Sequence, residues 1–263
     1  MKKKIMLYVV LFGIGLPTWG AYDFSAVSPN GQTLYYKVSS PTECYVTWPC
    51  DTATLWRNVW TGYTKPVGNV IIPETVQNGG QTFTVMGVGA GAFCGCSAMT
   101  SITLPSSARA IGRTSFWKCT ALTAINMPNT VSTIGRNAFD SCINLQVMAL
   151  PEALTTIDTS LFLHCTSLRV VTIPHNVTRI CAYAFMYCND IDTCYFNADS
   201  CFCDIYDIYV NEYPELFYPE KFIKISGLDN GITPHKFLVD NRDNRDIILN
   251  VVFSIISYFQ RKN

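Results

Sequence analysis

Phenylalanine and cysteine recur together in the middle of the chain, the cysteine always three residues after the phenylalanine and successive pairs 23 residues apart. The pairs are Phe93 and Cys96, Phe116 and Cys119, Phe139 and Cys142, Phe162 and Cys165, and Phe185 and Cys188. Cysteines in such a pattern can form disulfides, ligate a metal, act as reactive thiols, or fill small apolar spaces in a core. The compartment and the fold decide among these chemistries.

The start of the chain predicts export. Residues 2–4 are lysines, residues 5–16 are mostly apolar, and Thr18 and Gly20 stand where a signal peptidase needs small side chains. We therefore expect a signal peptide over residues 1–20, whose apolar run is too short to span a bilayer. The mature chain is expected to be secreted or displayed at the cell surface, and the periplasm is a further location compatible with the signal peptide. It is expected to have no membrane span. Disulfides are permitted in such compartments.

Charge is low and balanced along the 263 residues, with 19 basic and 19 acidic side chains and no run of like charge after the signal peptide. Nucleic acid and anionic membrane surfaces are therefore not expected partners. Hydrophobic residues make up 49% of the chain, which is enough for a sizeable core.

A unit of 23 residues is repeated about four times, and residues 122–142 are one example. Proline marks one position of the unit, at Pro105, Pro128, Pro151 and Pro174. Leu122, Ile125 and Met127 have the spacing of a leucine-rich repeat and predict a short strand. The proline ends this strand, because it cannot donate a hydrogen bond to a neighbouring strand.

The rest of the unit returns along the core. Val131 and Ile134 are expected to face inward, and residues 138–142 are expected to form a short helical turn with Phe139 and Cys142 on one face. One unit cannot bury this face, but a stack of units makes a continuous core. We predict a leucine-rich-repeat solenoid with a parallel sheet on its concave side and short helical or irregular turns on its convex side.

Four segments follow from the limits of the repeat. The signal peptide of residues 1–20 precedes a small β-rich cap over 21–66, the solenoid over 67–203, and a degenerate repeat with a C-terminal cap over 204–263. Within the solenoid, the turn residues 77–80 predict an inserted hairpin. In the last segment, Phe237 is assigned to a degenerate coil. Cys44 and Cys50 flank a short segment and could pair, but the sequence leaves this open.

The coil over residues 125–142 resembles the BspA-type leucine-rich repeat of bacterial surface proteins. Residues 21–27 and 31–36 are similar to the mature start of many exported members from the gut Bacteroides group, and residues 196–201 resemble a segment that follows the early repeats there. The resemblance implies secretion or surface display and a role in adhesion to host proteins or other cells. It implies no catalytic activity.

Catalytic and metal sites are not expected. The three histidines are His164, His175 and His235, and the first two occupy variable positions of the repeat. A catalytic base needs a fixed orienting partner, and such positions do not supply one. The C-x-C pairs at residues 94–96 and 201–203 lie at opposite ends of the repeats and lack the spacing of a structural zinc site. Carboxylates between residues 204 and 220 are read as a solvated face rather than a hydrolase site. No metal or cofactor is predicted.

The outward residues of the concave strands are the candidate binding site. They form two columns, Ser101, Ala124, Val147, Val170 and Thr193, and Thr103, Asn126, Ala149, Thr172 and Tyr195. These side chains are small and nearly uncharged, which suits close approach by an extended peptide or a glycan. Tyr195 is the aromatic anchor expected on this face, whereas Trp117 and Tyr187 would mark a different surface.

The expected function is that of a non-enzymatic, exported surface or secreted protein that binds a host or bacterial surface protein or a glycan. The alternative is a structural repeat protein of the envelope with no ligand recognition of its own. For the cysteines, five in one column cannot all pair, and parallel side chains disfavour disulfides between neighbours. We predict a ladder of buried thiols that pack beside the repeat phenylalanines.

Overall fold

The computed structural model describes residues 22–50, 59–191, 193–196, 200–205 and 235–240. The predicted signal peptide and most of residues 204–263 lie outside this part. The described part contains β-strands and turns and no helix, and so no helix that is long and apolar enough to cross a membrane.

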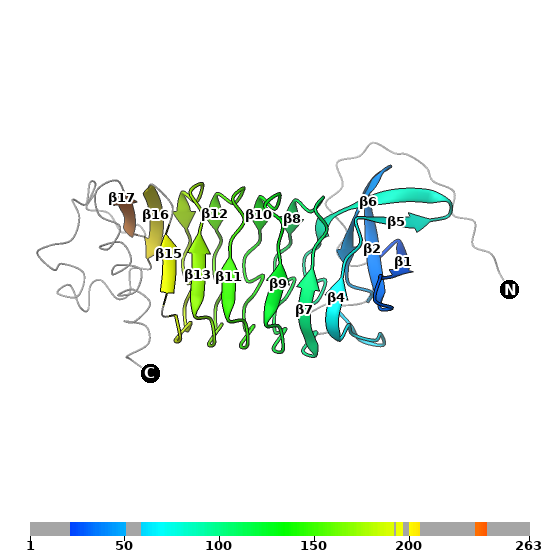
Figure 1. Ribbon diagram of the computed structural model, residues 1–263, viewed down its shortest axis with the longest axis horizontal. Helices are drawn as coiled ribbons and strands as arrows, with labels where there is room; N and C mark the ends of the chain where they lie inside the picture. Colours follow the sequence, from blue (N-terminus) through cyan, green and yellow to red (C-terminus); the bar gives the residue numbers. More distant parts are fainter. Residues whose placement is uncertain (1–21, 51–58, 192, 197–199, 206–234, 241–263) are drawn as a thin grey trace, which may run out of the picture.

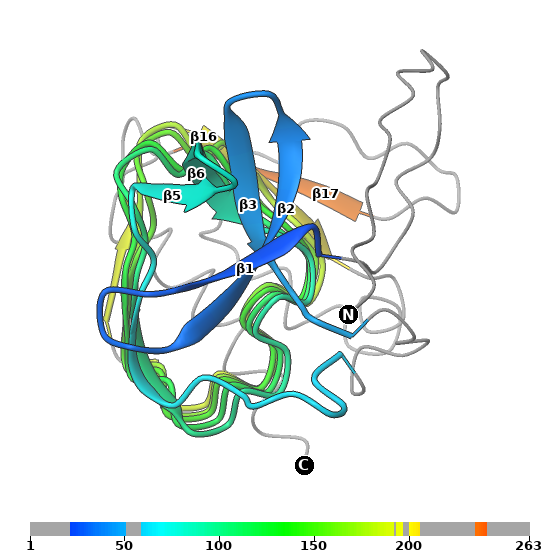
Figure 2. The same cartoon turned by 90° about the vertical axis from the view of Figure 1, so that its right-hand side faces the viewer.

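Five coils of the chain stack side by side, followed by two strands of a sixth (Figure 1). We number them coil 1 (residues 68–98), coil 2 (99–121), coil 3 (122–144), coil 4 (145–167) and coil 5 (168–190). Seen along the stack, successive coils superimpose on one another (Figure 2). This is the leucine-rich-repeat solenoid that the 23-residue period predicts, because equal units that pack on their own copies advance by a constant step.

Two sides of the solenoid are made of parallel strands. The first side is formed by β4 (Gly68–Ile71), β7 (Met99–Thr103), β9 (Ala124–Asn126), β11 (Val147–Ala149), β13 (Val170–Ile173) and β15 (Thr193–Phe196). The second side is formed by β6 (Gln81–Val88), β8 (Ala110–Ile111), β10 (Thr133–Ile134), β12 (Thr156–Ile157), β14 (Arg179–Ile180) and β16 (Ser200–Ile205). Most partners are 23 residues apart, as Ser101 and Ala124 are in β7 and β9.

Turns form the third side, and here the expectation of a short helical turn over residues 138–142 is wrong. Asn137 and Ser141 have left-handed backbone angles, with φ of 56° and 60°. Equivalent residues of coils 1, 2, 4 and 5 also have positive φ. A right-handed helix needs negative φ throughout, so each coil makes two successive tight turns instead. Of the two kinds of turn that were predicted for this side, helical or irregular, the chain adopts the irregular one.

Left-handed residues also direct the backbone toward the next coil. In coil 3 the N–H groups of Asn137, Phe139 and Ser141 donate to carbonyls of coil 4 at 2.7–3.1 Å. The N–H groups of Asp140 and Cys142 donate within their own turn at 3.2 and 3.1 Å. Alternate amides thus bond between coils and within them, so the turn side holds the stack together without a sheet.

The N-terminal cap is joined to the solenoid through a sheet. Strands β1 (Phe24–Val27), β2 (Thr33–Ser40) and β3 (Glu43–Thr47) are antiparallel, and β3 continues into the second side by pairing in parallel with β6. Phe24 stacks on Tyr36 at a centroid distance of 5.3 Å in the core of this cap. Cys44 is a buried free thiol, so a disulfide with Cys50 is not formed.

The inserted hairpin is confirmed. Strand β5 (Thr75–Asn78) pairs antiparallel with β6, and Gly79 and Gly80 form the turn with φ of 58° and 85°. Positive φ at both central residues is the geometry of a type I′ turn, which glycine adopts without strain. At the other end of the stack, β17 (His235–Asp240) pairs antiparallel with β16. The strand around Phe237 therefore does not add a parallel coil.

Glu74 ties the hairpin to coil 2. Its carboxylate accepts hydrogen bonds from the backbone N–H groups of Ser106 (2.6 Å) and Ser107 (3.3 Å) and from the Ser107 hydroxyl (3.1 Å). These donors, above all the Ser106 N–H, favour the charged form and lower the pKa of Glu74 below its ordinary value of 4.5.

Glu74→Gln is expected to lower the melting temperature at neutral pH, because an amide oxygen accepts weaker hydrogen bonds than a carboxylate does. A group whose pKa is lowered by folding stabilises the protein above its unfolded pKa and loses that contribution as the pH falls. The difference from the unmodified chain should therefore shrink as the pH drops below 4.5. Thermal melts from neutral pH to about pH 3 measure it, with the exposed Glu152→Gln as control. A difference that stays constant in acid would contradict this role.

Candidate binding surface and the cysteine ladder

We call the outward surface of β4, β7, β9, β11, β13 and β15 the strand face. The structure places all ten predicted column residues on it. Five are exposed, namely Ala124, Asn126, Val147, Ala149 and Tyr195, and five are half-buried, namely Ser101, Thr103, Val170, Thr172 and Thr193. Residues that alternate with them, such as Ile102, Met148 and Val171, are buried in the core. The period of two along each strand therefore separates surface from core.

The strand face has one more coil than the sequence columns contain. Asn69 pairs in register with Ser101, and Ile71 pairs with Thr103, so β4 adds a residue to each column. The Ser101 hydroxyl donates to Asn69 Oδ1 at 2.9 Å. The strand-proline pattern of residues 70–73 could have identified this extension, because a proline also follows β7, β9, β11 and β13.

The cap bounds the strand face at its N-terminal end. Gln32 Nε2 donates to the backbone carbonyls of Val67 and Asn69, both at 2.8 Å, and Gln32 Oε1 accepts from the Val67 N–H at 2.7 Å. Asn30 also donates to the carbonyl of Asn69. The loop before β2 is therefore fixed against β4, and the face begins at a defined edge.

None of the column residues is an acid, a lysine, an arginine or a histidine. The half of the face formed by coils 1–3 is mostly polar, whereas the half formed by β11, β13 and β15 is richer in apolar groups. Val147 is 56% exposed and Tyr195 is 58% exposed, with Val170 half-buried between their strands. Burial of these exposed apolar side chains against an uncharged partner would be favourable, because it removes apolar surface from water.

Trp117 and Tyr187 lie on the turn side, away from the strand face. Trp117 packs partly against the core, with Lys118 Nζ 4.6 Å from the centre of its ring. Tyr187 stacks on His164 of the preceding coil at a centroid distance of 4.6 Å. Of the two rings, only that of Tyr187 makes a stacking contact between turns of neighbouring coils.

His164 is one of the histidines for which no catalytic role was predicted. His164 Nδ1 lies 3.7 Å from Asp140 Oδ1. The Asp140 carboxylate is buried, and it accepts from the Ser141 hydroxyl at 2.8 Å and from Asn137 Nδ2 at 3.2 Å. This cluster links the turns of coils 3 and 4. Among the described residues, no group of three or more histidine, cysteine or acidic side chains could hold a metal.

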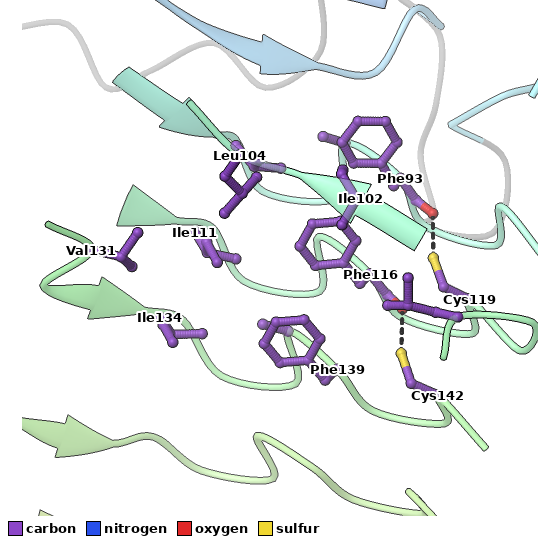
Figure 3. Packing of buried hydrophobic residues seen from close by; sticks show 14 of the residues in the cluster. Phe93, Ile102, Leu104, Ile111, Phe116, Cys119, Val131, Ile134, Phe139 and Cys142 are labelled. Carbon is purple, nitrogen blue, oxygen red and sulfur yellow. Dashed lines mark hydrogen bonds between the residues drawn. The ribbon is translucent and has the colours of Figure 1, made fainter. Parts of the chain in front are cut away.

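The cysteine column is a hydrogen-bonded ladder. From Cys119 onward, each thiol of the column donates to the backbone carbonyl of the phenylalanine one coil earlier, and Figure 3 shows two of these bonds. The Sγ–O distances are 3.1 Å from Cys119 to Phe93, 3.2 Å from Cys142 to Phe116, 3.1 Å from Cys165 to Phe139 and 3.0 Å from Cys188 to Phe162. The same carbonyls accept the backbone N–H of the cysteine three residues later. Each carbonyl thus uses both lone pairs.

The phenylalanines form a second column beside the thiols. Phe93, Phe116, Phe139, Phe162 and Phe185 stack with centroid distances of 5.3–5.5 Å and interplanar angles of 4–14°. All five cysteines of the ladder are buried, and Cys96, Cys119, Cys142 and Cys165 are free thiols. This arrangement agrees with the predicted ladder of buried thiols. The hydrogen bond to the carbonyl was not predicted, because the sequence does not show which backbone atom meets the sulfur.

Burial makes these thiols poor nucleophiles. It raises the pKa of Cys119, Cys142 and Cys165 well above the ordinary range, since a thiolate would lose its hydration there. The pKa of Cys94 is raised to about 12 by the same cause. Thiols in this state carry little of the reactive thiolate at neutral pH.

The ladder thiols are therefore expected to resist alkylation in the folded protein and to react fully after denaturation without reductant. Intact-mass measurement of iodoacetamide adducts under both conditions checks this. Thiols that become reactive only after a reductant is added would show that the column contains disulfides.

Substitutions at Cys142 separate packing from hydrogen bonding. Cys142→Ala should lower the free energy of unfolding by about 1–3 kcal/mol, because it leaves a small cavity and removes the second donor to the Phe116 carbonyl. Cys142→Ser keeps a donor and should be more stable than the alanine variant. Urea unfolding of both variants measures this. An alanine variant more stable than the serine variant would mean that the thiol acts only as an apolar filler.

Comparison with known proteins finds a family model that matches the repeats. A family model described as a BspA type Leucine rich repeat region matches residues 64–205 in six copies. This range begins just before β4 and ends with β16. No curated protein matches the chain.

Solved structures similar to the chain are bacterial leucine-rich-repeat proteins. A protein from T. pallidum is 22% identical, with 66% of this chain and 78% of that chain covered and a TM-score of 0.46. One from Bacteroides ovatus is 22% identical, with 67% and 54% covered and a TM-score of 0.42. A leucine rich cell surface protein from Faecalibacterium prausnitzii is 21% identical, with 69% and 56% covered and a TM-score of 0.49. The chain thus spans only about half the length of the last two.

Proposed function

The chain belongs to the BspA-type leucine-rich repeat family, and on this basis we propose that it is an exported, non-enzymatic protein that binds a protein or glycan partner on its strand face. The observation that carries the proposal is the exposed, uncharged surface of β11, β13 and β15. Val147 and Tyr195 expose more than half of their area there.

The chemistry of the strand face limits the kind of partner. Ala124 and Ala149 leave the backbone accessible, so an extended chain can approach closely. Thr172 and Asn126 offer hydrogen-bonding groups beside the apolar ones. Tyrosine combines a large contact area with a polar tip and is often a strong contributor to interfaces, which gives Tyr195 the role of anchor. A neutral polypeptide segment or a neutral saccharide fits this combination better than a charged ligand does.

Export is proposed from the signal-peptide pattern of residues 1–20 and is consistent with the cell-surface location named for the protein from F. prausnitzii. The balanced charge of the chain argues against a polyanionic partner. The partner is proposed to be a host or bacterial surface protein or glycan.

The test combines a binding screen with matched variants. The purified chain is screened against a glycan array and against immobilised extracellular proteins. Ala149→Arg, which places a charge in the middle of the strand face, should weaken any genuine interaction by about tenfold or more. Thr155→Arg, on the exposed second side of the same coil, should leave binding unchanged.

The alternative, a structural envelope protein without a ligand, would gain support if no partner is retained in either screen. If both arginine variants weaken binding equally while circular dichroism shows both to be folded, the contact does not lie specifically on the strand face and that part of the proposal is wrong.

A further inference from the structure

Both strand-built sides of the solenoid are interrupted at the same place. The first side is divided into β4-β7-β9 and β11-β13-β15, and the second into β6-β8-β10 and β12-β14-β16. Strands β9 and β11, like β10 and β12, are neighbours in the stack but do not pair (Figure 1). Both gaps lie between coils 3 and 4, which we call junction 3/4.

The backbone hydrogen bonds between coils show where the pairing is lost. At the junction of coils 2 and 3, the N–H groups of Leu104, Thr123, Ser132 and Gly135 donate across the coils at 2.9–3.2 Å. At the junction of coils 4 and 5, the N–H groups of Leu150, Arg169, Thr178 and Cys181 do so at 2.8–3.1 Å. The amides in the same places at junction 3/4 belong to Met127, Gln146, Thr155 and Asp158. Within the described part of the chain, none of these four has a backbone acceptor across the junction.

Side-chain burial agrees with the loss of pairing. Ile102 and Met148 occupy the same position as Ile125 in the neighbouring coils and are each 1% exposed. Ile125 is half-buried, and so is Met127 two residues later. The apolar edge of coil 3 that should be covered by coil 4 is therefore open to water.

The turn side of junction 3/4 is intact. Phe139 stacks on Phe162 at 5.5 Å, the Cys165 thiol donates to the Phe139 carbonyl at 3.1 Å, and the Ser141 N–H donates to the Leu163 carbonyl at 2.7 Å. Coils 3 and 4 are thus connected along one of three sides and parted along the other two.

A change in the repeat accounts for the opening. Coils 1–3 have glycine after the inward residue of the second side, at Gly89, Gly112 and Gly135. A Cβ on Gly135 would lie 2.6 Å from the backbone nitrogen of Arg113, so the close approach of coils 2 and 3 requires glycine. Coils 4 and 5 have Asp158 and Cys181 in this position. Two coils that both have glycine at this position, or both have a larger residue there, can stack by simple translation. A coil with a Cβ at this position cannot approach a glycine coil as closely as a second glycine coil does.

A bridging side chain is lost at the same junction. Ser107, Thr130 and Asn176 each donate to a carbonyl of the preceding coil, at 2.8, 2.8 and 2.7 Å. The equivalent residue of coil 4 is Ala153, which has no donor in its side chain. Two independent substitutions in coil 4 therefore act against pairing with coil 3.

We propose that junction 3/4 is a built-in flexure point, at which the two halves of the solenoid can swing about the intact turn-side ladder. The opening crosses the strand face between Asn126 and Ala149, so it separates the polar half of that face from the apolar half. The curvature of the face is then adjustable at one defined place. This inference rests on the packing of the coils and does not depend on whether the strand face binds a partner.

Hydrogen–deuterium exchange of the purified chain at residue resolution tests the proposal. The amides of Met127, Gln146, Thr155 and Asp158 should exchange about a hundredfold or more faster than those of Leu104, Thr123, Ser132 and Gly135, because exchange requires an amide to be free of its hydrogen bond. The two sets occupy equivalent places in adjacent junctions of one molecule. Equal protection of both sets would overturn the proposal.

Variants of coil 4 test the cause. The double variant Ala153→Thr, Asp158→Gly restores the residue types of coil 3 and should protect the amides of Gln146 and Thr155. The matched variant Ala153→Thr, Asp158→Ala removes the carboxylate but keeps a Cβ, and should leave both amides fast. If both variants protect the amides equally, the glycine mismatch is not the cause. If the first variant does not protect them, the assigned mechanism is wrong.

Discussion

The stack depends on the hydrogen bonds that the backbone carbonyl of each repeat phenylalanine accepts. On the turn side of the described coils no sheet connects one coil to the next. Instead, the carbonyl of each repeat phenylalanine from coil 1 to coil 4 accepts a hydrogen bond from the thiol of the next coil and another from an amide N–H of its own turn. A buried carbonyl left with an unused lone pair among apolar rings would be less favourable. The thiol is small enough to fit and weakly polar enough to be buried, which accounts for cysteine in this column.

The rest of the architecture follows from this ladder and its neighbours. Left-handed residues such as Asn137 and Ser141 turn alternate amides toward the next coil, and the phenylalanine rings stack because their backbones are held one step apart. With the turn side fixed, the strands of the other two sides come into register at the junctions other than junction 3/4. The same logic explains why coils 3 and 4 stay together although their strands do not pair, since the thiol and ring contacts continue across that junction.

The surface chemistry is distributed by side. His164 and Tyr187 lie on the turn side and link neighbouring turns, since His164 approaches Asp140 of the preceding coil and Tyr187 stacks on His164. The strand face is left with small uncharged residues and a few exposed apolar ones, Val147 and Tyr195 among them. The solenoid thus combines a hydrogen-bonded turn side with an uncharged strand face.

The sequence by itself determined the repeat of the coils, their buried columns, the inserted hairpin and the outward position of the strand-face residues. It could do so because every coil packs on a near-copy of itself, so one period specifies all of these at once. Tertiary structure alone decided the left-handed turns in place of a helical one, the bond from Cys142 to the Phe116 carbonyl, the joining of β3 to β6, and the open junction beside Asp158. Each of these depends on how closely two backbones approach across a junction, a distance that is set by contacts between residues far apart in the chain.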